Sequence, residues 1–122
     1  MSHFKNLPLA ARLRHAWAGL RHAAGAERSL RAQLVALCAA LALLWYLRPA
    51  PLWWALVLLA CSGVIAGELL NTALERLADH LHPQAHAQIR AVKDCAAAAV
   101  LVLAAGALCV AAALALELWR AH

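Results

Sequence analysis

Residues 49–79 read PAPLWWALVLLACSGVIAGELLNTALERLAD and join an uncharged apolar run to a polar stripe. The run Pro49–Gly67 holds 19 residues without a charge, and a helix of about 20 residues crosses a hydrocarbon core of about 30 Å. Four polar side chains follow at spacings of three, four and four residues: Glu68, Asn71, Glu75 and Asp79. That spacing places them on one face of an α-helix. The stretch therefore predicts a transmembrane helix with a polar face at one end.

Two more apolar runs flank this one, Ala32–Leu47 and Cys95–Leu116. The 122-residue chain is 66% hydrophobic, whereas soluble domains have roughly 45–50% apolar residues. A soluble helical bundle is the disfavoured alternative, because so short a chain has no interior large enough to cover this apolar surface. We predict an all-α membrane protein with a single domain, residues 1–122, and three spans at about 29–47, 52–81 and 92–119.

An amphipathic helix is predicted over residues 4–24, ahead of the first span. Its apolar side chains, Trp17 among them, lean to one side, and basic side chains occupy the rest. This pattern is typical of a helix that lies in the membrane interface. Trp17 is therefore expected on the lipid side.

Lysine and arginine residues are concentrated on one side of the predicted membrane. Nine of the eleven precede the first span or lie in or near the loop between the second and third spans. The positive-inside rule then places the N-terminus and that loop in the cytoplasm, and the C-terminus outside. The net charge of +5 favours adhesion to anionic lipid and requires no nucleic-acid partner.

The polar stripe indicates a site, because carboxylates at a membrane boundary are costly unless they bind something. Glu68 is expected near the inner boundary, where a carboxylate suits the role of proton acceptor. Asn71 is placed to orient either a substrate hydroxyl or a metal ligand. Glu75 and Asp79 supply the hard oxygen atoms that magnesium prefers.

Lys93 and Asp94 open the third span across the short loop. A lysine there can neutralise phosphate charge. Acids for a metal, a lysine for phosphates and a boundary glutamate as base are the parts of a phosphoryl-transfer site. The chain lacks the Walker loop, so such a kinase would fall outside the common nucleotide-binding classes. The alternative interpretation is that these residues bind no ligand and form a solvent-exposed helix end with salt bridges.

The pattern Glu68-x-x-Asn71-x-Ala-x-Glu75-x-x-x-Asp79, followed by Lys93-Asp94, resembles the small integral-membrane diacylglycerol kinases of bacteria. The same family includes the undecaprenol kinases. The resemblance continues upstream in Trp17-x-Gly19-Leu20 and Glu27, and it covers essentially the whole chain. It departs from the family at His15-Ala16, where members often carry Tyr-Ser, and this leaves the contacts to the nucleotide base open.

The resemblance implies a homotrimer in the bacterial inner membrane, with active sites shared between neighbouring subunits at the cytoplasmic face. It implies transfer of the γ-phosphate of ATP to the primary hydroxyl of a lipid. Glu68 would be the general base. Glu27 and Glu75 would hold the magnesium ions that bridge the ATP phosphates, and Asn71 would support the same centre.

Three further residues would serve the nucleotide by the same resemblance. Lys93 would contact phosphate, Asp94 would brace the phosphate and metal region, and Asp79 would lie on the nucleotide side.

The leading hypothesis for the function is an ATP-dependent, magnesium-dependent kinase that makes phosphatidic acid from diacylglycerol. The first alternative is the same chemistry on undecaprenol. A lower-ranked alternative is a small proton-coupled transporter or channel subunit, with Glu68 as the proton carrier inside the membrane. A non-catalytic assembly protein is the third alternative.

Overall fold

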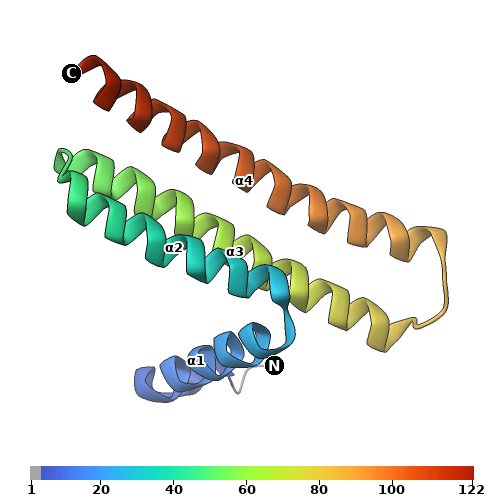
Figure 1. The fold of residues 1–122 in the computed structure, drawn as a ribbon. Coiled ribbons are helices and arrows are strands. Elements are labelled where there is room, and N and C mark those ends of the chain that lie inside the picture. The colour runs from blue at the N-terminus through green and yellow to red at the C-terminus, as the bar shows by residue number, and fades with distance from the viewer. Residues whose placement is uncertain (1–3) are drawn as a thin grey trace.

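The computed structural model describes residues 4–122, and within them every regular element is a helix (Figure 1). A 3-10 turn and four α-helices follow one another along the chain: Phe4–Asn6, α1 at Leu9–Ala26, α2 at Arg28–Leu47, α3 at Pro51–Leu81 and α4 at Ala87–Arg120. The all-α prediction is confirmed.

Three of these helices, α2, α3 and α4, are long and apolar enough to cross a membrane. They contain 20, 31 and 34 residues, and at about 1.5 Å per residue all three reach the thickness of the hydrocarbon core. The three predicted spans are therefore present as helices. The last helix begins five residues before the predicted start at 92, because His86 caps it: His86 Nδ1 accepts a hydrogen bond from the Gln88 amide at 3.1 Å.

Helix α1 starts at Leu9, where the sequence predicted a continuous helix from residue 4. Pro8 lacks an amide hydrogen and takes an extended conformation, and its carbonyl accepts hydrogen bonds from the Ala11 and Arg12 amides, as a helix N-terminus requires. Apolar side chains of α1 are exposed in the single chain: Leu13 is 61% exposed and Trp17 is 62% exposed. The interfacial position of this helix stays a prediction.

A single extended residue, Glu27, separates α1 from α2. Its backbone angles, φ −111° and ψ 116°, turn the chain sharply, so that α1 lies across the end of α2 (Figure 1). We call this residue the Glu27 corner. It decides what the first turn of α2 can contact.

Helix α3 is the central helix, since it packs against both α2 and α4. The G-x-x-x-G pair Gly63 and Gly67 faces Leu103 of α4. A Cβ atom at Gly67 would stand 2.5 Å from Leu103 Cδ1, so the absence of a side chain lets the two helices approach closely. These two glycines therefore serve close packing of α3 against α4.

Candidate functional site

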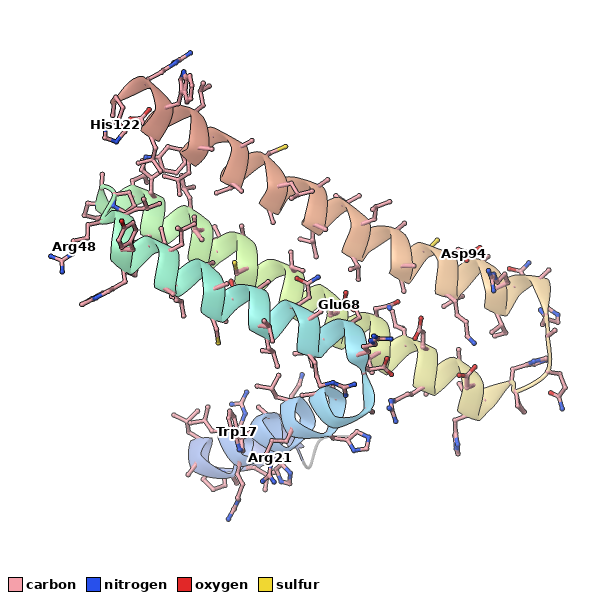
Figure 2. The ribbon with its side chains drawn as sticks, viewed as in Figure 1. Trp17, Arg21, Arg48, Glu68, Asp94 and His122 are labelled. Atoms are coloured by element: carbon pink, nitrogen blue, oxygen red, sulfur yellow. The ribbon has the colours of Figure 1, made fainter. Side chains whose placement is uncertain are left out.

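The polar face of α3 lies where the Glu27 corner and α2 approach it (Figure 2). We call Glu68, Asn71, Glu75 and Asp79 the acidic face. Glu68 is buried, with 7% of its surface exposed. Ser29 in the first turn of α2 donates its hydroxyl hydrogen to Glu68 Oε1, with 2.6 Å between the oxygen atoms. A buried carboxylate is stable only when such donors satisfy it, so the first turn of α2 holds Glu68 in place.

Glu27 is paired with Arg76, the residue directly after Glu75. Arg76 Nη2 lies 3.7 Å from Glu27 Oε1, and Arg76 Nη1 lies 3.3 Å from His22 Nε2. Arg31 reinforces the same junction by donating from Nη1 to the carbonyl oxygens of Ala24 and Gly25. These contacts tie α1, the Glu27 corner and α3 together beside the acidic face.

The middle of the acidic face contains an unsatisfied acceptor. Asn71 Nδ2 donates to Glu75 Oε1 at 3.4 Å. Asn71 Oδ1 is buried and has no hydrogen-bond partner in the described part of the chain. An orphaned buried acceptor costs about 1–3 kcal/mol, and such a cost is usually offset by a ligand, a water or an ion.

These oxygen donors fit a magnesium ion. Within residues 4–122 no three His, Cys, Asp or Glu side chains lie close enough together to hold a metal on their own. Magnesium, however, is usually bound by one or two carboxylates together with waters and substrate phosphates. Glu75, the free oxygen of Asn71 and, once released from Arg76, Glu27 are ligands of that kind.

Lys93 of α4 reaches back to the end of the acidic face. Its Nζ donates to Asp79 Oδ1 at 2.5 Å, and its side chain is 31% exposed. Asp94, the next residue, points elsewhere, because consecutive side chains on a helix diverge by about 100°. Asp94 Oδ1 lies 3.3 Å from Arg90 Nε in an exposed pair on α4.

Within one chain, the structure thus gathers Glu27, Glu68, Asn71 and Glu75 around α3, and adds Asp79 with Lys93 further along the same helix. It does not bring Asp94 or Trp17 to this group; Figure 2 shows Trp17 on α1, apart from Glu68 on α3. Sequence reasoning missed Ser29 and Arg76. Arg76 directly follows Glu75, so the spacing of the acidic face does not include it. Nothing in the sequence links Ser29 to Glu68, which lies 39 positions away.

Comparison with known proteins gives two matches. Residues 14–115 match the family model of the prokaryotic diacylglycerol kinases. The undecaprenol kinase of Bacillus subtilis (strain 168) is 34% identical over 90 residues, which cover 74% of this chain and 73% of the relative. With three helices suited to cross a membrane, the chain is therefore a multi-pass membrane lipid kinase that belongs to the prokaryotic diacylglycerol kinase family.

Proposed function

We propose that this lipid kinase transfers the γ-phosphate of ATP to the primary hydroxyl of diacylglycerol and forms phosphatidic acid. The observation that carries this chemistry is the contact between Ser29 and Glu68. A serine hydroxyl is a primary alcohol, and it already donates a hydrogen bond to a buried carboxylate at 2.6 Å. The same carboxylate can therefore accept a hydrogen bond from the primary hydroxyl of a lipid.

Glu68 acts as the general base. It takes the proton of the lipid hydroxyl as that oxygen attacks the γ-phosphorus of ATP. The new oxygen–phosphorus bond forms while the bond to the β-phosphate oxygen breaks, and ADP leaves. The second carboxylate oxygen of Glu68 is available for the incoming hydroxyl, while Ser29 keeps the first oxygen fixed. Positioning and proton transfer are the main contributions that a protein makes to phosphoryl transfer.

The remaining polar side chains handle the triphosphate. Glu75 and Glu27 would hold magnesium, with Asn71 Oδ1 beside them; the metal would neutralise charge on the phosphates. Lys93 contacts a phosphate once it leaves Asp79, with which it is now paired.

A homotrimer with shared sites explains the two residues that one chain leaves outside the group. Asp94 and Trp17 both lie on exposed surfaces of the single chain. In a shared site, Asp94 would brace the phosphate and metal region of a neighbouring copy, and Trp17 would face lipid. We place the site at the cytoplasmic face of the bacterial inner membrane, with the C-terminus outside, because the basic residues cluster at that end.

An apolar hollow suits the lipid tail. It has a volume of about 660 Å³ and is lined by side chains of α1, α2 and α3, and it reaches Leu69, the residue after Glu68. A substrate with its tail in this hollow and in the surrounding lipid would present its hydroxyl at the level of Glu68. Both diacylglycerol and undecaprenol have a primary hydroxyl and a long apolar tail.

The second candidate function is therefore undecaprenol phosphorylation, which the similarity to an undecaprenol kinase favours. The purified protein should be assayed with magnesium and ATP on each lipid in the same mixed micelles. We expect phosphatidic acid to form faster; a strong preference for the polyprenol would replace diacylglycerol by undecaprenol in the proposal.

Glu68→Gln tests the base and separates the kinase from a proton carrier. Gln keeps an acceptor for Ser29 at nearly the same volume, so the fold and nucleotide binding should survive. Turnover should fall by on the order of 10²-fold or more, the range for lost acid–base catalysis. Glu117→Gln, near the far end of α4, is the matched control. Lipid phosphorylation at full rate in Glu68→Gln would refute the assignment.

A further inference from the structure

The hydroxyl group of Ser29 differs from the other hydroxyl groups of the chain. The sequence holds three serines, one threonine and one tyrosine. Ser62 Oγ donates to the Leu59 carbonyl oxygen within its own helix at 2.9 Å, and Thr72 is buried. Among the hydroxyl groups of residues 4–122, that of Ser29 is the one that donates to a carboxylate, Glu68 of α3 (Figure 2).

This hydroxyl has the chemistry of a phosphoryl acceptor. It is a primary alcohol, as is the lipid hydroxyl of the proposed reaction. Glu68 Oε1 accepts its hydrogen at 2.6 Å, within the range of about 2.6–3.2 Å that a general base needs toward the group it deprotonates. Ser29 is exposed while Glu68 is buried, so a phosphate can approach the hydroxyl from the open side.

Ser29 also lies close to the side chains proposed to hold the triphosphate. Glu27 precedes it by two residues, at the corner between α1 and α2. Its partner Glu68 shares the acidic face with Asn71 and Glu75, which are joined by a hydrogen bond. A γ-phosphate placed for attack by a hydroxyl on Glu68 therefore lies near Ser29 Oγ as well.

We propose that Ser29 accepts the γ-phosphate of ATP when no lipid acceptor occupies the site, an inference that rests on the kinase function proposed above. Glu68 takes the proton of the Ser29 hydroxyl as Oγ attacks the γ-phosphorus. The bond from Oγ to phosphorus forms, the bond from the γ-phosphorus to the bridging oxygen breaks, and ADP leaves with that electron pair. A bound lipid competes with this step, because its hydroxyl takes the same phosphate.

The first turn of α2 stabilises a phosphate on Ser29. Ser29 is the second residue of this helix, whose start has neither a side-chain cap nor an acidic residue. The free amides and the positive end of the helix dipole favour an anion there. Arg28 and Arg31 lie one position before and two positions after Ser29, and phosphoserine near arginine forms charge-assisted hydrogen bonds.

The modification blocks lipid phosphorylation. Phosphorylated Ser29 has no hydroxyl hydrogen to donate to Glu68, and it carries a charge of about −1.5 to −2 at neutral pH. That charge lies beside the carboxylate that must receive the proton of the lipid hydroxyl, and it repels the phosphates of a second ATP. A kinase that has ATP but no lipid acceptor therefore inactivates its own site.

The first experiment looks for the phosphate itself. The purified full-length protein is incubated with magnesium and ATP in detergent micelles free of diacylglycerol and polyprenol, and phosphorylated peptides are located by mass spectrometry. We expect phosphate at Ser29, which added diacylglycerol reduces and Ser29→Ala abolishes. Glu68→Gln should form it more slowly, by on the order of 10²-fold, because glutamine cannot take the proton. Ser2→Ala is the matched control and should leave phosphate at Ser29 unchanged.

The second experiment measures the block. Lipid phosphorylation by the unsubstituted protein should fall during the incubation in proportion to the phosphate on Ser29, and treatment with alkaline phosphatase should restore it. Ser29→Ala, which is slower from the start, should keep its own rate through the same incubation.

Two outcomes would overturn the inference while the kinase stands. One is the absence of phosphate at Ser29 after prolonged incubation, or equal amounts in Glu68→Gln. The other is full lipid phosphorylation by protein that carries the phosphate. Failure of the proposed function is distinct, because the unsubstituted protein would then form no phosphorylated lipid from ATP.

Discussion

Removing the hydroxyl of Ser29 should slow phosphoryl transfer while the fold stays intact. Ser29 Oγ is the hydrogen-bond donor that the structure gives to Glu68, at 2.6 Å, and the Glu68 side chain is buried. In Ser29→Ala the carboxylate loses this fixed position, and one buried oxygen loses its partner. Ser29→Thr keeps a hydroxyl at the same place and serves as the matched control.

The size of the effect follows from the chemistry of this contact. A hydrogen bond to a charged group contributes about 1.5–3 kcal/mol, which corresponds to about 10- to 150-fold in rate at 1.36 kcal/mol per decade. Ser29 itself is exposed, so water replaces part of the lost bond. We therefore expect turnover to fall by roughly 10-fold, the lower end of that range.

The assay is lipid phosphorylation at saturating ATP and lipid, measured in four proteins: the unsubstituted chain, Ser29→Ala, Glu68→Gln and the double variant. A double-mutant cycle isolates the coupling between two residues in contact. If Ser29 acts through Glu68, then Ser29→Ala should change turnover less than about 2-fold once Glu68 is Gln. The same 10-fold loss in both backgrounds, or no loss in either, would refute the reasoning. Thermal unfolding of each variant detects any damage to the fold.

Five other substitutions test the rest of the site and the packing of α3 against α4. Glu75→Ala and Glu27→Ala should weaken magnesium-dependent nucleotide binding, measured by calorimetry, because each removes a hard oxygen ligand; unchanged affinity in both would remove the metal role. Arg76→Gln should lower the magnesium concentration for half-maximal binding by about 2- to 5-fold, since a half-exposed ion pair with Glu27 contributes only about 0.2–1 kcal/mol, and a higher requirement would contradict the release of Glu27. Gly67→Val should lower the thermal midpoint more than Gly63→Val, because an added Cβ meets Leu103 at 2.5 Å in the first case and at 3.6 Å in the second.

The helices and the acidic face were predictable from the sequence because both depend on local order along the chain. An uncharged run of sufficient length has few alternatives to a spanning helix. The acidic face belongs to one helix, so its spacing alone aligns Glu68, Asn71, Glu75 and Asp79. The end of α3 at Leu81 also agrees with the prediction, since Pro83 follows shortly after.

The contacts of these residues were not predictable, because they depend on how helices meet. Ser29 reaches Glu68, and Arg76 reaches Glu27, only because the Glu27 corner is extended where a helix could have continued. The start of α4 depends on the ring of His86 in a five-residue loop, which spacing does not reveal. Lys93 and Asp94 formed one sequence motif, yet their partners, Asp79 and Arg90, lie on different helices.

The same pairs explain how acids persist beside an apolar bundle before any ligand binds. Five acids lie at or near this end of the described chain, and each has a partner: Ser29 for Glu68, Arg76 for Glu27, Asn71 for Glu75, Lys93 for Asp79 and Arg90 for Asp94. For the buried Glu68, a carboxylate without a partner would cost several kcal/mol.

Under the proposed function, binding of a metal-bound triphosphate would be an exchange of partners. A phosphate would take Lys93 from Asp79, and the metal would take Glu27 from Arg76. Because Lys93 and Glu27 would each exchange one opposite charge for another, neither would pay the full desolvation cost of an unpaired charge. The exchange would also move Glu27, the single extended residue between α1 and α2. We therefore expect nucleotide binding to change the orientation of α1 relative to α2. The apolar side of α1 is the side predicted to contact the lipid.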